Sequence, residues 1–230
     1  MNRIVILLVC AMPASRVKNW VLRQFNYQVP RTASFGPCLV VNVGFISLGA
    51  DARIGPFNVF RDLRSLELGD RSVIGQWNWV SAASPLVVAP GHGRLSLGRE
   101  SALTSRHYVD ASGGVSIGDF TTVAGVRSTF ITHGIDWRRN EQSTRPIVIG
   151  DYCLVSSNVA LPPGAIVPNR SLVGMGATIV GGADEGMLWV GARATAVKPV
   201  GGEYFSRPRG FVDPPGAMHR PEVAPGGTSS

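Results

Sequence analysis

Apolar residues recur at every sixth position in the second half of the chain. The aliphatic members of this pattern are Ile149, Val155, Leu161, Val167, Val173 and Ile179. Four places after each comes a small or medium residue: Cys153, Val159, Ala165, Ser171, Ala177 and Ala183. Neither an α-helix nor an ordinary strand repeats at six. A short fixed period of this kind predicts a β-helix, because one coil cannot bury its apolar residues alone and must stack on its neighbours.

The same register continues upstream when insertions are allowed. Its positions are Leu48, Ile54, Phe60, Leu68, Ile74, Val80, Leu97, Leu103, Val109, Ile117, Val123 and Thr129. Three hexads close one coil, so we expect Ile149 to lie under Val167 and Val155 under Val173. The register predicts about six coils, whose parallel strands pair about 4.8 Å apart. Glycines follow many of the aliphatic residues and suit tight corners, where a Cβ would be strained.

The two ends of the chain lose the period. We therefore expect an N-terminal segment over residues 1–30, a β-helix domain over 31–198, and a Gly/Pro-rich tail over 199–230 without fixed structure. The apolar run at 4–12 resembles a weak signal peptide and is too short to span a bilayer. A short basic amphipathic helix follows from Ser15. It either caps the open end of the prism or contacts a membrane surface.

The composition fits one domain with a real core. Of the 230 residues, 44% are hydrophobic and only 16% are charged, as expected when most residues lie in tight coils. The net charge of +7 favours a phosphorylated ligand or an anionic membrane surface. No run of Lys or Arg is typical of a nucleic-acid interface, so no nucleic acid partner is expected. Cys10, Cys38 and Cys153 form no CxxC pair, which favours a cytoplasmic protein, or one peripheral to the inner face of the membrane.

Breaks in the register locate residues that leave the core. The longest breaks fall between Val80 and Leu97 and between Thr129 and Ile149. The second break begins at Thr132-His133-Gly134, so His133 stands where a coil ends and an external loop begins. A neutral imidazole there can take a proton from a hydroxyl or amine as it attacks a thioester. The alternative is an exposed or hydrogen-bonded bystander histidine.

Several motifs together resemble the hexapeptide-repeat acyltransferases, in particular the branch that O-acetylates bacterial surface sugars. The motifs are Thr132-His133 before a loop, the restart over 145–151, the run 173–177, the closing stretch 190–198, and an N-terminal helix over 13–25. The resemblance covers roughly residues 30–198. It implies a left-handed parallel β-helix, all-β in class, that usually assembles as a homotrimer.

The resemblance also implies a reaction and its residues. The reaction is transfer of an acetyl or other acyl group from acyl-CoA to a hydroxyl of a saccharide acceptor, without a metal and without a covalent enzyme intermediate. In this family the histidine at the position of His133 is the general base. Small residues and backbone amides along the coils hold the donor, which corresponds here to Ser157, Met175 and Gly176. Lys198, with Thr195 nearby, matches the basic place that meets the CoA phosphates, or is a solvated charge.

A second group of candidates concerns the acceptor. Asp110 begins the same face as His133 one coil earlier, where it could orient the imidazole or bind an acceptor hydroxyl. His107 lies close in sequence, and both belong either to the acceptor site or to a corner cluster that satisfies turn backbone groups. Trp137 could stack on a sugar or pack in a trimer interface. Arg145, at the end of the same loop, is a further acceptor candidate.

Two other functions stay open on the sequence. A zinc hydrolyase like the trimeric β-helical carbonic anhydrases needs three converging imidazoles, and only His107 and His133 are plausible, with Arg138 where another histidine would be wanted. A non-catalytic scaffold would use the prism only to build a trimer. The acceptor itself depends on the loops at 85–96 and 133–146 and on a neighbouring subunit.

Overall fold

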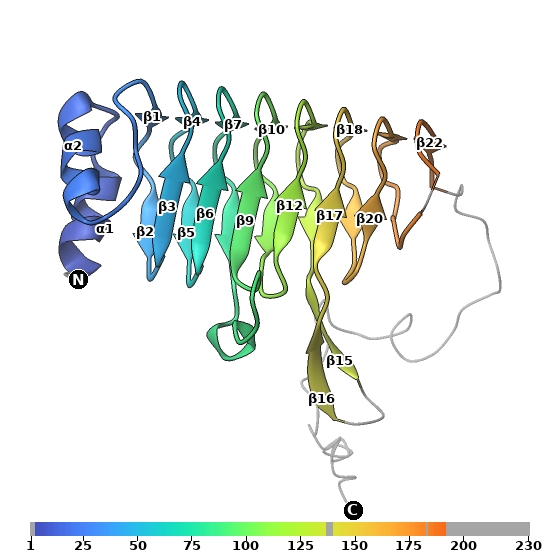
Figure 1. Ribbon diagram of the computed structural model, residues 1–230. Coiled ribbons are helices and arrows are strands. Elements are labelled where there is room, and N and C mark those ends of the chain that lie inside the picture. The colour runs from blue at the N-terminus through green and yellow to red at the C-terminus, as the bar shows by residue number, and fades with distance from the viewer. Residues whose placement is uncertain (1–2, 137–139, 183, 192–230) are drawn as a thin grey trace, which may run out of the picture. The chain divides into compact units, whose positions relative to one another are not determined.

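A computed structural model describes residues 3–136, 140–182 and 184–191. Trp137, Thr195 and Lys198, together with the expected tail, lie outside the described residues. The chain begins with two helices, α1 (Arg3–Ala11) and α2 (Arg16–Gln24), and continues almost wholly as short parallel strands. These strands form three faces of a prism (Figure 1).

Each face is one parallel sheet. Face A contains β3 (Phe45–Leu48), β6 (Ser65–Leu68), β9 (Arg94–Leu97), β12 (Val115–Ile117), β17 (Ile147–Ile149) and β20 (Ile166–Val167). Face B contains β1 (Ser34–Phe35), β4 (Arg53–Ile54), β7 (Val73–Ile74), β10 (Ala102–Leu103), β13 (Thr122–Val123), β18 (Leu154–Val155), β21 (Leu172–Val173) and β22 (Leu188–Trp189). Face C contains β2 (Leu39–Val41), β5 (Val59–Arg61), β8 (Trp79–Ser81), β11 (Tyr108–Asp110), β14 (Thr129–Phe130) and β19 (Ala160–Leu161).

The winding is that of a left-handed parallel β-helix, as predicted. The chain runs up the front on face A, passes behind across face B and returns on face C, while it advances from left to right in Figure 1. Faces A and C each hold six strands, and face B holds eight because β1 precedes and β22 follows the others. The expectation of about six coils is therefore confirmed.

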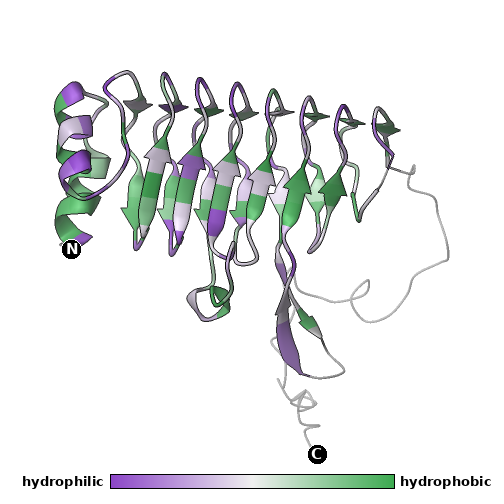
Figure 2. Cartoon of the chain, viewed as in Figure 1, coloured by the Kyte–Doolittle hydropathy of each residue, from purple (hydrophilic) through white to green (hydrophobic). Residues whose placement is uncertain are grey.

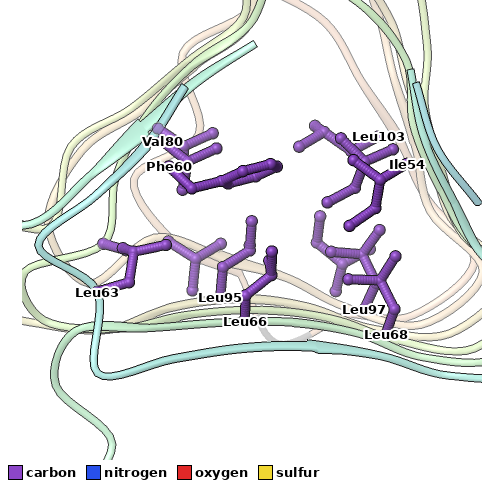
Figure 3. Packing of buried hydrophobic residues seen from close by; sticks show 14 of the residues in the cluster. Ile54, Phe60, Leu63, Leu66, Leu68, Val80, Leu95, Leu97 and Leu103 are labelled. Atoms are coloured by element: carbon purple, nitrogen blue, oxygen red, sulfur yellow. The ribbon is translucent and has the colours of Figure 1, made fainter. Parts of the chain in front are cut away.

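The six-residue register is confirmed at every paired position that the sequence selects except Thr129. Ile149 lies opposite Val167, and Val155 lies opposite Val173. The aliphatic side chains point into the prism and are buried, as Figure 3 shows for Ile54, Phe60 and their neighbours. Each coil therefore contributes a layer to one continuous core, and the stack is stabilised by contacts between layers rather than within one coil.

One register position is wrong. Phe130, not Thr129, is the inward residue, since Phe130 pairs with Val109 and is fully buried. The corner before it carries one extra residue, and it accommodates this residue with two left-handed positions, Gly125 at φ +68 and Arg127 at φ +64. A strict count of six cannot detect this insertion.

The corner glycines are needed for close approach. A Cβ built on Gly118 would lie 2.3 Å from Oδ1 of Asp151 and 2.6 Å from the carbonyl carbon of Gly150 in the next coil. The φ of Gly118 is outside the left-handed region. The predicted strain at this corner therefore comes from the neighbouring coil and not from the local backbone conformation.

Both helices lie at the N-terminal end of the prism (Figure 1). Ile6, Cys10 and Leu22 point inward and join the core. Neither helix is long enough to cross a bilayer, and no other described helix is. The end of the prism is thus covered by two helices, as one of the two alternatives for this segment predicts.

Two insertions leave the prism at the corner between faces C and A. The first, over residues 84–93, contains the 3-10 turn η1 (Ser84–Leu86). The second is an antiparallel hairpin of β15 (His133–Asp136) and β16 (Glu141–Thr144), where the break in the register predicts an external loop. The two insertions meet where Oγ1 of Thr144 lies 3.5 Å from Nε2 of His92.

Candidate functional site

His133 is the first residue of the hairpin and lies directly after a coil of the prism. Thr132 before it is fully buried, while the His133 side chain is 40% exposed. The main chain is held on both sides, since β15 pairs with β16 and the backbone N–H of Arg145 donates to the carbonyl of Thr132. The imidazole therefore projects from a fixed backbone toward solvent.

Asp110, one coil earlier, holds the imidazole. Its Oδ2 lies 2.7 Å from Nδ1 of His133 and accepts the backbone N–H of Thr132 at 2.8 Å and of His133 at 3.1 Å. Its Oδ1 accepts hydrogen bonds from the backbone N–H and the hydroxyl of Ser112. The hydroxyl of Thr132 lies 2.8 Å from Oδ2 as well, so six donors hold the carboxylate at the edge of the prism.

The charge on Asp110 is stabilised by these contacts. Burial alone would raise the pKa of the carboxyl, but hydrogen bonds from Ser112, His133 and Thr132 outweigh burial and lower the pKa below its ordinary value. An ionised carboxylate only accepts, so Nδ1 of His133 must carry the proton of the bond between them. In the neutral imidazole Nε2 is then unprotonated and can act as a base.

An open groove of about 390 Å³ lies beside this pair. It is lined by Arg61, Asp62, Ser81, Ala82, Ala83, Ser84, Pro85, Tyr108, Asp110 and His133. These residues lie in or directly after successive strands of face C. The groove therefore runs along the corner from which both insertions leave the prism. A polar ligand in this groove can contact hydroxyls, a guanidinium, carboxylates and an aromatic ring.

His107 is not brought to this groove. It is only 2% exposed, its Nδ1 accepts the backbone N–H of Ser128 at 3.1 Å, and its Nε2 lies 3.1 Å from the hydroxyl of Thr104. Burial lowers the pKa of His107 to about 4. The ring is a neutral member of a corner hydrogen-bond cluster, so a substrate contact for His107 is not supported, whereas the corner alternative is.

The residues expected to hold the donor lie on another edge. Ser157 accepts the backbone N–H of Val126 through its hydroxyl, and its carbonyl accepts the N–H of Gly176. Met175 next to them is 72% exposed. All belong to the corner between faces B and C, whereas His133 belongs to the corner between C and A. The structure therefore brings Ser157, Met175 and Gly176 together, but not with His133 of the same chain.

Arg145 lies beside the site through its backbone. Its side chain is exposed and extends toward Gly164, where an added Cβ would meet Cδ of Arg145 at 3.2 Å. It does not line the groove of His133. The remaining candidates, Trp137, Thr195 and Lys198, lie outside the described residues.

The zinc hydrolyase alternative requires a group of metal-ligating side chains. Within the described ranges, no three His, Cys, Asp or Glu side chains are grouped so that they could hold a metal ion. His107 and His133 do not line a common groove. The pair of imidazoles on which that alternative depends is therefore not assembled in one chain.

Three contributors to the site were missed from the sequence. Thr132 and Ser112 fix the carboxylate of Asp110, and Tyr108 lines the groove. The spacing offered a signal, since an Asp-x-Ser segment at 110–112 can form a local hydrogen-bonded turn. The register also indicates that Ser157 and His133 lie at different corners, because Ser157 follows an inward residue of face B and His133 follows an inward residue of face C.

Comparisons with known proteins add a similarity in structure. No protein-family model matches the chain, and no curated protein matches it. Among solved structures, the crystal structure of the polySia specific acetyltransferase NeuO is similar over 74% of this chain and 87% of that chain. The sequence identity is 16% and the TM-score is 0.42. A similarity of this degree implies nothing about the activity of this chain.

Proposed function

We propose that the protein is an O-acyltransferase that moves an acetyl or other acyl group from acyl-CoA to a hydroxyl of a saccharide acceptor. The observation that carries this proposal is the Asp110–His133 pair, with 2.7 Å between Oδ2 and Nδ1, at the edge of an open groove. The resemblance of the Thr132-His133 motif to hexapeptide-repeat acyltransferases gives the reaction class. Under this proposal His133 is the general base.

The proposed reaction needs one proton acceptor and no covalent intermediate on the protein. Nε2 of His133 accepts the proton of the acceptor hydroxyl while its oxygen attacks the thioester carbonyl. The C–S bond then breaks, and the imidazolium returns its proton to the departing thiolate. Asp110 keeps Nδ1 protonated and stabilises the imidazolium through its negative charge.

The lining of the groove supports a saccharide acceptor. Ser81 and Ser84 offer hydroxyls, Arg61 and Asp62 offer charged groups, and Tyr108 offers an aromatic side chain that is about half exposed. Sugars present hydroxyls in several directions together with an apolar ring face, so polar side chains and an aromatic wall complement them. The groove also reaches His133, which brings an acceptor hydroxyl to the proposed base.

We propose that the protein assembles as a homotrimer, and the separation of the two edges supports an assembly in which subunits share each site. Thr132 follows Val126 by six residue steps across face C, which at about 3.3 Å per step span roughly 20 Å. One acyl donor lying along Ser157 and Gly176 would not place its thioester beside His133 of the same chain. We therefore propose that the donor edge of one subunit meets the His133 edge of its neighbour, so that each site is shared.

Thiol release from acetyl-CoA in the presence of a panel of sugars tests the proposal. The protein should release CoA thiol with at least one sugar, and His133→Ala should lower kcat by about 10²–10⁴-fold while CoA binding survives. His92→Ala is a useful second histidine variant, because it removes an imidazole outside the groove. Normal turnover in His133→Ala, or no acyl transfer to any hydroxyl acceptor, would overturn the assignment.

A further inference from the structure

The outer side of the N-terminal helices carries large apolar side chains. Ile4, Leu8, Met12, Val17 and Trp20 are between 46% and 68% exposed. We call these five residues, together with Arg16, Arg23 and Arg31, the N-terminal end surface. Most of α1 is hydrophobic in colour in Figure 2. The covering of the prism accounts only for the inner side.

Buried hydrogen bonds from Lys18 hold the inner side of the two helices against the prism, so their other side faces outward. Nζ of Lys18 donates to the carbonyls of Cys10 at 2.8 Å, Met12 at 2.9 Å and Gly36 at 2.8 Å. Lys18 is fully buried, and its ammonium also lies 4.5 Å from the ring centroid of Phe35. These contacts tie α1, α2 and the first coil together. The exposed apolar residues of the two helices therefore cannot turn inward without breaking this buried centre.

An end cap of a stacked-coil protein normally has a polar outer face, because it ends the core and meets water. Here Leu8 and Trp20 stand where such polar residues are expected. The two helices that carry these side chains are in contact, and large exposed apolar patches mark interaction surfaces. The N-terminal end surface therefore indicates a partner.

The charge of this region identifies the partner's chemistry. The first fifty residues contain no Asp or Glu, and their charged side chains are Arg3, Arg16, Lys18, Arg23 and Arg31. Arg16, Arg23 and Arg31 line a hollow of about 250 Å³ together with Val17 and Trp20. Guanidinium groups bind phosphate oxygens, and a tryptophan beside them suits the boundary between headgroups and acyl chains.

We propose that the N-terminal end surface docks on an anionic lipid bilayer. The apolar side chains of α1 and α2 enter the boundary of the headgroup layer, and Arg16, Arg23 and Arg31 contact lipid phosphates. The two helices lie on the membrane, since each has only nine residues. This inference is independent of the proposed acyl transfer, because the His133 groove lies at a corner of the prism and the docking surface lies at its end.

Co-sedimentation of the full-length protein with sucrose-loaded vesicles tests the proposal. We expect binding to vesicles of phosphatidylcholine with 30 mol% phosphatidylglycerol that is at least about tenfold stronger than to phosphatidylcholine alone, and weaker in 500 mM than in 50 mM NaCl. Leu8→Asp should reduce binding by about tenfold or more. Arg16→Gln and Arg31→Gln should each reduce binding to anionic vesicles by about fivefold, with little effect on neutral ones.

A matched control distinguishes a specific surface from general stickiness. Val180 is 73% exposed on a segment near the opposite end of the described chain, so Val180→Asp should leave vesicle binding unchanged. Circular dichroism should show that Leu8→Asp keeps the fold, since the side chain it replaces is exposed. Equal binding to neutral and anionic vesicles, or equal loss in Leu8→Asp and Val180→Asp, would overturn the proposal. The proposal would also be overturned if the protein self-associated without vesicles and Leu8→Asp abolished that self-association. The surface would then bind a second copy of this chain.

Discussion

Nδ1 of His133 lies 2.7 Å from Oδ2 of Asp110, although the two residues belong to successive coils and are 23 positions apart. The stacking of coils therefore aligns the proposed base with the carboxylate that contacts it. Because Asp110 is also held by Thr132 and Ser112, the imidazole is presented in one orientation and one tautomer.

Replacement of Asp110 by Asn should lower kcat by about 10²–10⁴-fold. An amide at this position can donate to Nδ1 and leave the proton on Nε2, which is the wrong tautomer for a base. Steady-state kinetics of acyl transfer measure the effect, with CoA affinity as the internal reference. Asp119→Asn is the matched control, because that carboxylate pairs with Arg99 on another corner. Equal kinetics for both variants would contradict the role given to Asp110.

Replacement of Thr132 by Val should destabilise the fold by about 1–3 kcal/mol. The fully buried hydroxyl accepts the backbone N–H of Gly113 at 2.8 Å and lies 2.8 Å from Oδ2 of Asp110. Valine keeps the volume and leaves the buried N–H without its acceptor. Urea denaturation measures the change, and Thr129→Val, on the outer side of β14, should change the free energy of unfolding by less than about 0.5 kcal/mol.

The buried His107 should make stability depend on pH in a defined window. Its pKa is lowered by burial from 6.5 to about 4 in the folded protein. The unfolded chain therefore binds a proton at higher pH than the folded one, and stability falls as pH drops from about 6.5 to about 4. The contribution of this group to that loss is on the order of 3 kcal/mol at pH 4.

His107→Gln provides the comparison for this pH dependence. Denaturation midpoints of the wild type and of His107→Gln, measured between pH 7.5 and 4.5, should converge as the pH falls. The variant lacks the titrating group, so its stability should vary less across this range. Parallel curves for the two proteins would show that His107 does not titrate as its burial requires.

Replacement of Gly118 by Ala should destabilise the prism by about 1–3 kcal/mol or more. The new methyl group would lie within 2.6 Å of the backbone of Gly150, so two coils would have to separate locally. Gly181→Ala is the control, because a Cβ there meets nothing within 4 Å. Thermal denaturation of both variants measures the difference, and a shift of equal size in each would refute the close-approach explanation.

The sequence predicted the core because burial repeats with the same spacing in every coil. Ile149, Val155 and their equivalents are aliphatic for one physical reason, which a period of six captures. The same counting selected Thr129 over Phe130, because an inserted residue at Gly125 changes the backbone path without changing the local composition. An insertion of this kind becomes visible only when strand pairs are known.

The site was predictable where it followed the register and not where it depended on turns. His133 and Asp110 begin corresponding corners, so their proximity followed from counting. The hydrogen bonds of Thr132 and Ser112 depend on the detailed geometry of two turns, which spacing does not encode. The burial of His107 likewise depends on the direction of one side chain at a corner, which a count of residues leaves open.

Both insertions leave the prism at the corner between faces C and A, while the other two corners carry only tight turns over the described coils. A β-helix tolerates added chain at a corner because the pairing of strands above and below is undisturbed. Under the proposed function, the loops at the C–A corner can therefore be replaced to bind a different acceptor, while the stacked strands hold His133 and Asp110 in the same orientation. Loop swaps at residues 84–93 and 134–143 are accordingly a route to altered specificity on an unchanged scaffold.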